Sequence, residues 1–132
     1  MRVMLDTNIL ISAIVFKSKI MRDVIARISE KGIIVLSSYI IEEFHEVIND
    51  KFAAKIGDLE QFLIELPFEL VYTPKILPKH DMFTIRDKDD EKILYSAVMA
   101  DVDVLVTGDK DFFDIEIERP DIVSHIEFLK KY

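Results

Sequence analysis

The 132 residues correspond to about one domain, and the 50% that are hydrophobic exclude a disordered chain because they are enough to form a core. The absence of cysteine excludes a disulfide framework and thiolate zinc sites. The net charge of −8 argues against binding nucleic acid through a basic surface, unless the acids gather around divalent cations or a basic partner chain is present.

No apolar run approaches the roughly 20 residues that a membrane span needs, and no secretory signal is clear at the N-terminus. We therefore expect a cytoplasmic protein that makes no membrane contact. Neither an internal repeat nor a second domain is visible, so we expect residues 1–132 to form a single domain.

The first predicted strand covers Arg2–Leu5, a short apolar run that ends at Asp6. A helix over Ile9–Phe16 follows, and either Thr7 or Asn8 has a side chain that can cap its N-terminus.

A second helix over Ile20–Lys31 ends at the first glycine of the chain, and the β-branched run Ile33–Leu36 predicts a second buried strand. Ser37 or Ser38 then caps a helix over Tyr39–Asn49.

Residues 50–66 are predicted to be helical in two pieces, with the break near Gly57–Asp58. A third strand over Phe68–Tyr72 is followed by a loop, Thr73–Phe83, that contains two prolines.

A helix over Asp87–Ala100 has an acidic first turn, which the helix dipole favours, and a fourth strand covers Val102–Val106. The remaining predicted elements are short: a helical turn near Asp111–Asp114, a strand over Ile122–Val123 and a last helix over Ile126–Lys131 capped by Ser124. Strands that are apolar on both faces and alternate with helices indicate an α/β fold with a parallel sheet covered on both sides.

Two acids lie where strands end. Asp6 closes the first predicted strand, and Asp109 follows the fourth by two residues. In open α/β sheets, ligands bind at the carboxyl ends of the strands. The alternative is ordinary turn and cap chemistry, which is common for an Asp after a strand.

A third acid leans toward the core from the helix over residues 39–49. At about 100° per residue, its apolar stripe consists of Ile40, Ile41, Phe44, Val47 and Ile48. Glu43 lies at the edge of this stripe, where a carboxylate is costly unless it is paired. Either a metal ion pairs it, or the side chain lifts its charge into water.

The helix over residues 87–100 supplies a fourth acid. Ile93, Leu94, Ala97 and Val98 define its buried face, and Asp90 projects near the centre of that face one turn earlier. The alternative, a solvated acidic helix start, explains the neighbouring acids better than it explains Asp90. Four carboxylates without cysteine fit a hard cation, Mg²⁺ or Mn²⁺, which can activate water and stabilise charge on a phosphoryl group.

Three segments together resemble the PIN-domain family: MLDTNILISA, SSYIIEEF and RDKDDEKILYSAVMADVDVLVTGDKDF. Each motif alone is weak, but their order and spacing are specific, and the resemblance spans positions 3 to about 113. It places four catalytic acids in a metal site: Asp6, Glu43, Asp90 and Asp109.

Further residues match the family motifs around these acids. Asn8 matches the Asn that supports the first Asp, and Thr107 matches the Thr beside the last. An alignment shifted by one residue would choose Glu91 instead of Asp90. Asp111 matches an outer acid of the site.

The resemblance implies a three-layer α/β/α sandwich, Rossmann-like, around a parallel sheet of about five strands. It also implies an Mg²⁺- or Mn²⁺-dependent endoribonuclease that hydrolyses single-stranded RNA. In its small size and in showing no additional domain, the chain is similar to toxins of the VapC kind, which are neutralised by a cognate antitoxin and are often homodimers.

Basic side chains would hold the flanking phosphates of an RNA strand. The candidates are Lys17, Lys19, Arg22 and Lys110, although ordinary surface charge explains any one of them. The three histidines are scattered along the chain and receive no chemical role.

Three other functions compete with the nuclease. A phosphatase with an Asp nucleophile would need a second acid two residues after Asp6, where this chain has Asn8. A phosphorylation receiver would need a pair of acids before the first helix and a Lys near the last strand, and neither stands out. A PIN fold that binds RNA or protein without cutting remains as the non-enzymatic alternative.

Overall fold

The computed structural model describes residues 1–132. Its strands are β1 (Arg2–Leu5), β2 (Ile33–Ser37), β3 (Phe68–Val71), β4 (Val104–Val106) and β5 (Asp121–Val123). Its α-helices are α1 (Thr7–Ile14), α2 (Lys19–Lys31), α3 (Ser38–Lys51), α4 (Ile56–Glu65), α5 (Lys88–Met99) and α6 (His125–Lys131). Two 3₁₀ turns complete the chain, η1 (Ala53–Lys55) and η2 (Lys110–Phe112).

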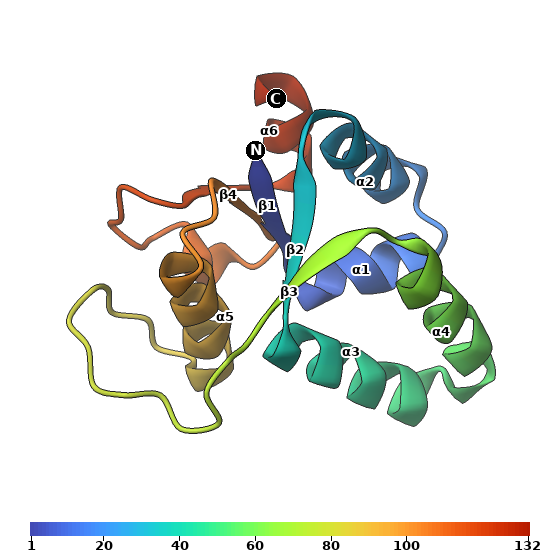
Figure 1. The fold of residues 1–132 in the computed structure, drawn as a ribbon, viewed down its shortest axis with the longest axis horizontal. Coiled ribbons are helices and arrows are strands. Elements are labelled where there is room, and N and C mark those ends of the chain that lie inside the picture. The colour runs from blue at the N-terminus through green and yellow to red at the C-terminus, as the bar shows by residue number, and fades with distance from the viewer.

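The five strands form one parallel sheet in the order β3-β2-β1-β4-β5. Helices cover both of its faces: α1, α2 and α4 lie on one side and α5 on the other (Figure 1). This arrangement confirms the predicted α/β/α sandwich with a five-stranded parallel sheet.

The core forms because the central strands are apolar on both faces. The side chains of β1 after its first residue, and all those of β4, are buried. Each helix adds one apolar stripe, and in α3 it consists of Ile40, Phe44 and Ile48, each 0% exposed. Glu42 and Glu46 of α3 are exposed on the opposite side.

The strand order places a topological switch point between β1 and β4. From β1 the chain proceeds toward β2 and β3, whereas β4 and β5 lie on the other side of β1. Connections from β1 and β4 therefore diverge, and such a switch point is where open α/β sheets bind ligands. The residues that follow β1 and β4 lie next to each other at this point, because Leu5 is in register with Val106.

The predicted start of the first helix is wrong by two residues. Helix α1 begins at Thr7, and its N-cap is Asp6 rather than Thr7 or Asn8. The physical reason is that the Asp6 carboxylate turns back onto the N–H of Thr7, at 2.7 Å, so strand and helix meet without an intervening loop.

The predicted break near Gly57–Asp58 is also misplaced, because α4 runs through Gly57. The chain breaks at Phe52, whose φ of −139° and ψ of 44° are not helical. The Phe52 ring packs edge-on against Phe16, with 5.7 Å between centroids. The helical segment is therefore interrupted at Phe52, where a tertiary contact is made, and not at Gly57, where the sequence predicted the interruption.

None of the helices combines the length and the apolar character that crossing a membrane requires.

Gly32 is needed for close approach of two backbones. A Cβ at Gly32 would lie 2.8 Å from the carbonyl carbon of Met1 and closer still to its oxygen, whereas a Cβ at Gly57 would meet nothing within 4 Å. We predict that Gly32→Ala lowers the free energy of unfolding by about 1–3 kcal/mol, as overpacking does. Gly57→Ala, the matched control, should raise it by up to about 1 kcal/mol. Urea denaturation measures both, and equal effects would contradict the packing described here.

Candidate metal centre

The carboxylate of Asp6 lies at the carboxyl end of β1 and is 4% exposed. Its Oδ1 accepts a hydrogen bond from the Thr7 N–H at 2.7 Å, and its Oδ2 accepts one from Thr107 Oγ1 at 2.8 Å. Both oxygens are therefore partnered, which offsets part of the cost of burying the group.

Thr107 joins the two strand ends. It is fully buried one residue after β4, and while its hydroxyl donates to Asp6 it also accepts a hydrogen bond from the Asp109 N–H at 3.1 Å. One side chain thus holds Asp6 and the backbone of Asp109 at the same point of the sheet edge.

Glu43 is held by two hydroxyls. The Thr7 hydroxyl donates to its Oε1, and the Tyr39 hydroxyl donates to its Oε2 at 3.3 Å. The Glu43 carboxylate is half-buried. Thr7 connects it to Asp6, because the Thr7 hydroxyl donates to Glu43 and the Thr7 N–H donates to Asp6. Glu43, which the sequence places at the edge of the apolar stripe, is therefore hydrogen-bonded near Asp6.

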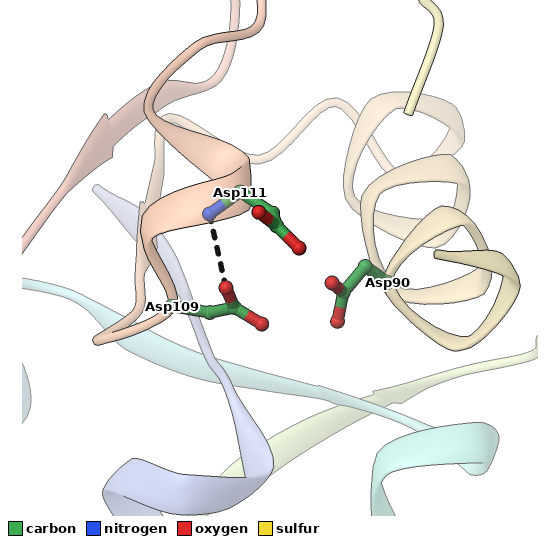
Figure 2. Close-up of side chains that lie close together, drawn as sticks. All are labelled: Asp90, Asp109 and Asp111. Atoms are coloured by element: carbon green, nitrogen blue, oxygen red, sulfur yellow. Dashed lines mark hydrogen bonds between the residues drawn. The ribbon is translucent and has the colours of Figure 1, made fainter. Parts of the chain in front are cut away.

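Three acids form the tightest cluster. Asp90, Asp109 and Asp111 each place a carboxylate oxygen within 4.8 Å of the others, and all three are half-buried. Figure 2 shows Asp90 reaching from α5 toward Asp109 and Asp111, which come from the turn around η2. The Oδ1 of Asp109 accepts a hydrogen bond from the Asp111 N–H at 2.9 Å, which fixes the turn that presents both acids.

The first turn of α5 decides which acid points inward. Asp87 is the N-cap, and its Oδ1 accepts hydrogen bonds from the N–H groups of Asp89 and Asp90, at 2.8 and 3.1 Å. Asp90 then faces the cluster, whereas Glu91 is one residue further round the helix and is not part of it. The structure therefore brings Asp90, rather than Glu91, together with Asp109 and Asp111.

Burial and mutual repulsion raise the pKa of two of these acids. Burial is the main cause of the pKa of Asp6 rising to about 6, and the charges of Glu43 and Asp109 add to it against the two hydrogen bonds. The pKa of Asp90 rises to about 7, again chiefly through burial and then through the charge of Asp109.

The donor set fits a hard divalent cation. It offers only carboxylate oxygens, which Mg²⁺ and Mn²⁺ prefer, and it contains no histidine or cysteine. Arg86 is the ion-pair partner of the cluster, with its Nη2 3.7 Å from Asp111 Oδ1, and its side chain is 89% exposed. That pair is too loose and too solvated to neutralise three carboxylates.

The side-chain hydrogen bond to Asp6 comes from Thr107, and Asn8, which the resemblance places in support of Asp6, makes none to it. Asn8 is exposed and makes no side-chain hydrogen bond, because α1 begins at Thr7 and carries Asn8 outward. Thr107, which the resemblance placed beside Asp109, accepts a hydrogen bond from the Asp109 N–H and also donates one to Asp6. Thr7 and Tyr39 were missed, although each lies within four residues of a candidate acid, which is the available signal.

Three of the basic candidates lie away from the acids. Lys17 and Arg22 line a hollow with residues of α1 and α4, beyond the far end of α1 from Asp6. Lys19 pairs with Asp23 at 2.9 Å. Lys110 is exposed directly after Asp109, and the sequence reasoning did not single out Arg86.

The raised pKa values predict that the metal-free protein becomes less stable as pH rises from about 4 to 7. In the unfolded chain these carboxyls lose their protons near their ordinary pKa of 3.8, whereas the folded state holds them up to about 6 and 7. The folded state therefore binds more protons in this window, and stability falls as pH increases.

Asp90→Asn should consequently raise the melting temperature at pH 8 in EDTA, and raise it less at pH 5, where the folded state still holds the proton that the unfolded chain has already released. Mn²⁺ at pH 8 should stabilise the unmodified protein more than the variant. Thermal unfolding of both proteins measures all three conditions, and an equal shift at both pH values would contradict the raised pKa of Asp90 in the folded state.

Thr7→Val removes the hydroxyl that positions Glu43 while keeping the shape of the side chain. We predict that Mn²⁺ binding weakens by about 10- to 100-fold, as is typical when an outer partner of a metal ligand is lost. Calorimetric titration measures the affinity. Thr73→Val is the matched control, because the Thr73 hydroxyl is also buried but pairs with Ser96 at 2.7 Å rather than with a carboxylate. Equal affinities in the two variants would refute the role of Thr7.

Comparison with known proteins agrees with this architecture. No curated protein matches the chain. Among solved structures, the chain is similar to one in the crystal structure of VapBC2 from Rickettsia felis bound to a DNA fragment from their promoter, with a TM-score of 0.70 and 19% identity over 93% of this chain and 97% of that one. Residues 2–111 match the PIN domain family. The chain therefore belongs to the PIN domain family.

Proposed function

We propose that the protein is an Mg²⁺- or Mn²⁺-dependent endoribonuclease that hydrolyses phosphodiester bonds of single-stranded RNA, with residues 1–132 acting as one nuclease domain. The observation that carries the proposal is the meeting of Asp90, Asp109 and Asp111 within 4.8 Å, at the sheet edge where Asp6 is also buried. Such a concentration of carboxylates is unfavourable in a fold that does not use it, because its members repel one another.

A divalent cation bound there would supply an activated water and would stabilise the negative charge that develops on the phosphoryl group. Asp6, Glu43, Asp90 and Asp109 would hold it, and the position of the Asp111 carboxylate within 4.8 Å of Asp90 and Asp109 supports adding Asp111 to this set. The remaining groups act on the ligands: Thr107 orients Asp6, and Thr7 orients Glu43. The catalytic geometry would then depend on buried hydroxyls rather than on the exposed Asn8.

We also propose that the protein is the toxin of a toxin–antitoxin pair and works as a homodimer. Support comes from its membership of the PIN domain family and from its likeness in fold to a chain of a VapBC2 complex. A basic antitoxin segment would compensate the net charge of −8, which a nucleic-acid-binding protein otherwise has to overcome.

Cleavage of end-labelled single-stranded RNA tests the nuclease. We expect cutting in Mn²⁺, none in EDTA, and a loss of more than about 100-fold in Asp90→Asn, because a direct ligand matters more than an outer partner. Glu91→Gln is the matched control, since it removes the neighbouring acid on the same turn and should retain most of the activity.

The same experiment separates the competing interpretations. Equal cutting by the protein and by Asp90→Asn would identify a contaminating nuclease. Binding of RNA without any metal-dependent cutting would favour the non-catalytic module, whose acids would then serve binding alone.

A further inference from the structure

A hollow of about 440 Å³ lies beside the acids, and Glu43 forms part of its wall. Its other walls come from the first turns of α3, from the residues directly after β3 and from the first turns of α5. Figure 1 shows the chain leaving β3 between α3 and α5. The volume is within the roughly 300–1,000 Å³ that is typical of small-molecule sites.

Two tyrosines give this hollow aromatic surface. Tyr72 is 74% exposed and makes no hydrogen bond, although large aromatic side chains usually bury most of their surface against other residues. Tyr39 is half-buried, and the ammonium of Lys92 lies 5.1 Å from its ring centroid. Exposed aromatic rings in a groove are the surfaces on which proteins stack the bases of single-stranded nucleic acids.

The charges of the hollow select which part of a nucleotide can enter. Glu42, Glu46 and Asp89 line it together with Lys75 and Lys92, so acids outnumber bases even before Glu43 is counted. A phosphate is repelled by this surface, whereas an uncharged base is not, and the N–H groups of a base are donors for carboxylate oxygens. Lys75 and Lys92 are the cations of this lining that a neighbouring backbone phosphate can contact.

We infer that this hollow binds the base of a nucleotide next to the phosphate that is cut at the acid cluster, with the base stacked on Tyr72. The inference rests on the proposed nuclease function. Glu43 lines the hollow and is connected to Asp6 through Thr7, so a base in the hollow sets which phosphate reaches the acids. Purines bind more tightly than pyrimidines there, since their larger faces cover more of the ring.

A series of RNA hexamers with the fluorescent base 2-aminopurine at each position in turn tests this, with Ca²⁺ replacing Mg²⁺ and a gel verifying that the strand stays intact. We expect quenching of the fluorescence at one position. Tyr72→Ala should weaken binding of that hexamer by about 5- to 150-fold, the range for losing one stacked base. Tyr72→Phe keeps the stacking ring and should bind within about twofold of the unmodified protein.

Ile76→Ala is the matched control, because Ile76 is 89% exposed in the same loop and does not line the hollow. It should bind as the unmodified protein does. Unchanged binding in Tyr72→Ala would overturn the inference. Uptake of a short arginine-rich peptide in a Tyr72-dependent manner, with no RNA bound, would also overturn it and make the hollow a peptide site.

Cleavage of RNA in Mn²⁺, measured separately, distinguishes failure of the inference from failure of the function. If the RNA is cut and its binding is independent of Tyr72, the base-binding role of the hollow is refuted and the nuclease function is retained. If binding depends on Tyr72 but the RNA is not cut, the nuclease function is refuted and the hollow is retained as a base-binding site. If the protein neither binds nor cuts the RNA, both the inference and the proposed nuclease function are refuted.

Discussion

The hydrogen bond from Thr107 to Asp6 joins the two strands at which the connections of this fold diverge. Because β1 and β4 are parallel and in register, the residues after them arrive side by side, and one leads into α1 while the other leads into η2. The same hydroxyl accepts a bond from the Asp109 backbone, so two acids far apart in sequence are positioned by one buried side chain. Glu43 and Asp90 then reach this point from α3 and α5.

Gathering these acids costs stability, and the surrounding structure limits the cost without removing it. Asp6 has both oxygens partnered and Glu43 receives two hydroxyls, yet the pKa of Asp6 still rises to about 6 and that of Asp90 to about 7. A divalent cation would replace the shared protons and turn repulsion into attraction. The net charge of −8, which at first argues against contact with nucleic acid, is thus partly a property of one site.

The first turns of α3 connect the acids with the hollow next to them. Tyr39 and Glu43 are one helical turn apart, and the hydroxyl of the first donates to the carboxylate of the second. A change in one of these side chains is therefore transmitted to the other. This coupling gives a physical route by which the part of a ligand that lies in the hollow can affect the geometry at the acids.

Local pattern determined much of this protein: the five strands, the helices between them, the acids at strand ends and the inward-facing Asp90 all follow from apolar periodicity and short-range capping. The sequence could not show that α1 begins at Thr7, because a carboxylate that turns back on its own helix decides it, or that α3 ends at Phe52, where the ring contacts Phe16 from another part of the chain. It also could not assign Thr7 to Glu43, bring Asp111 up to Asp90 or place Tyr72 beside the acids. These relations join residues on separate elements, and only packing of the helices on a registered sheet sets the distances between them.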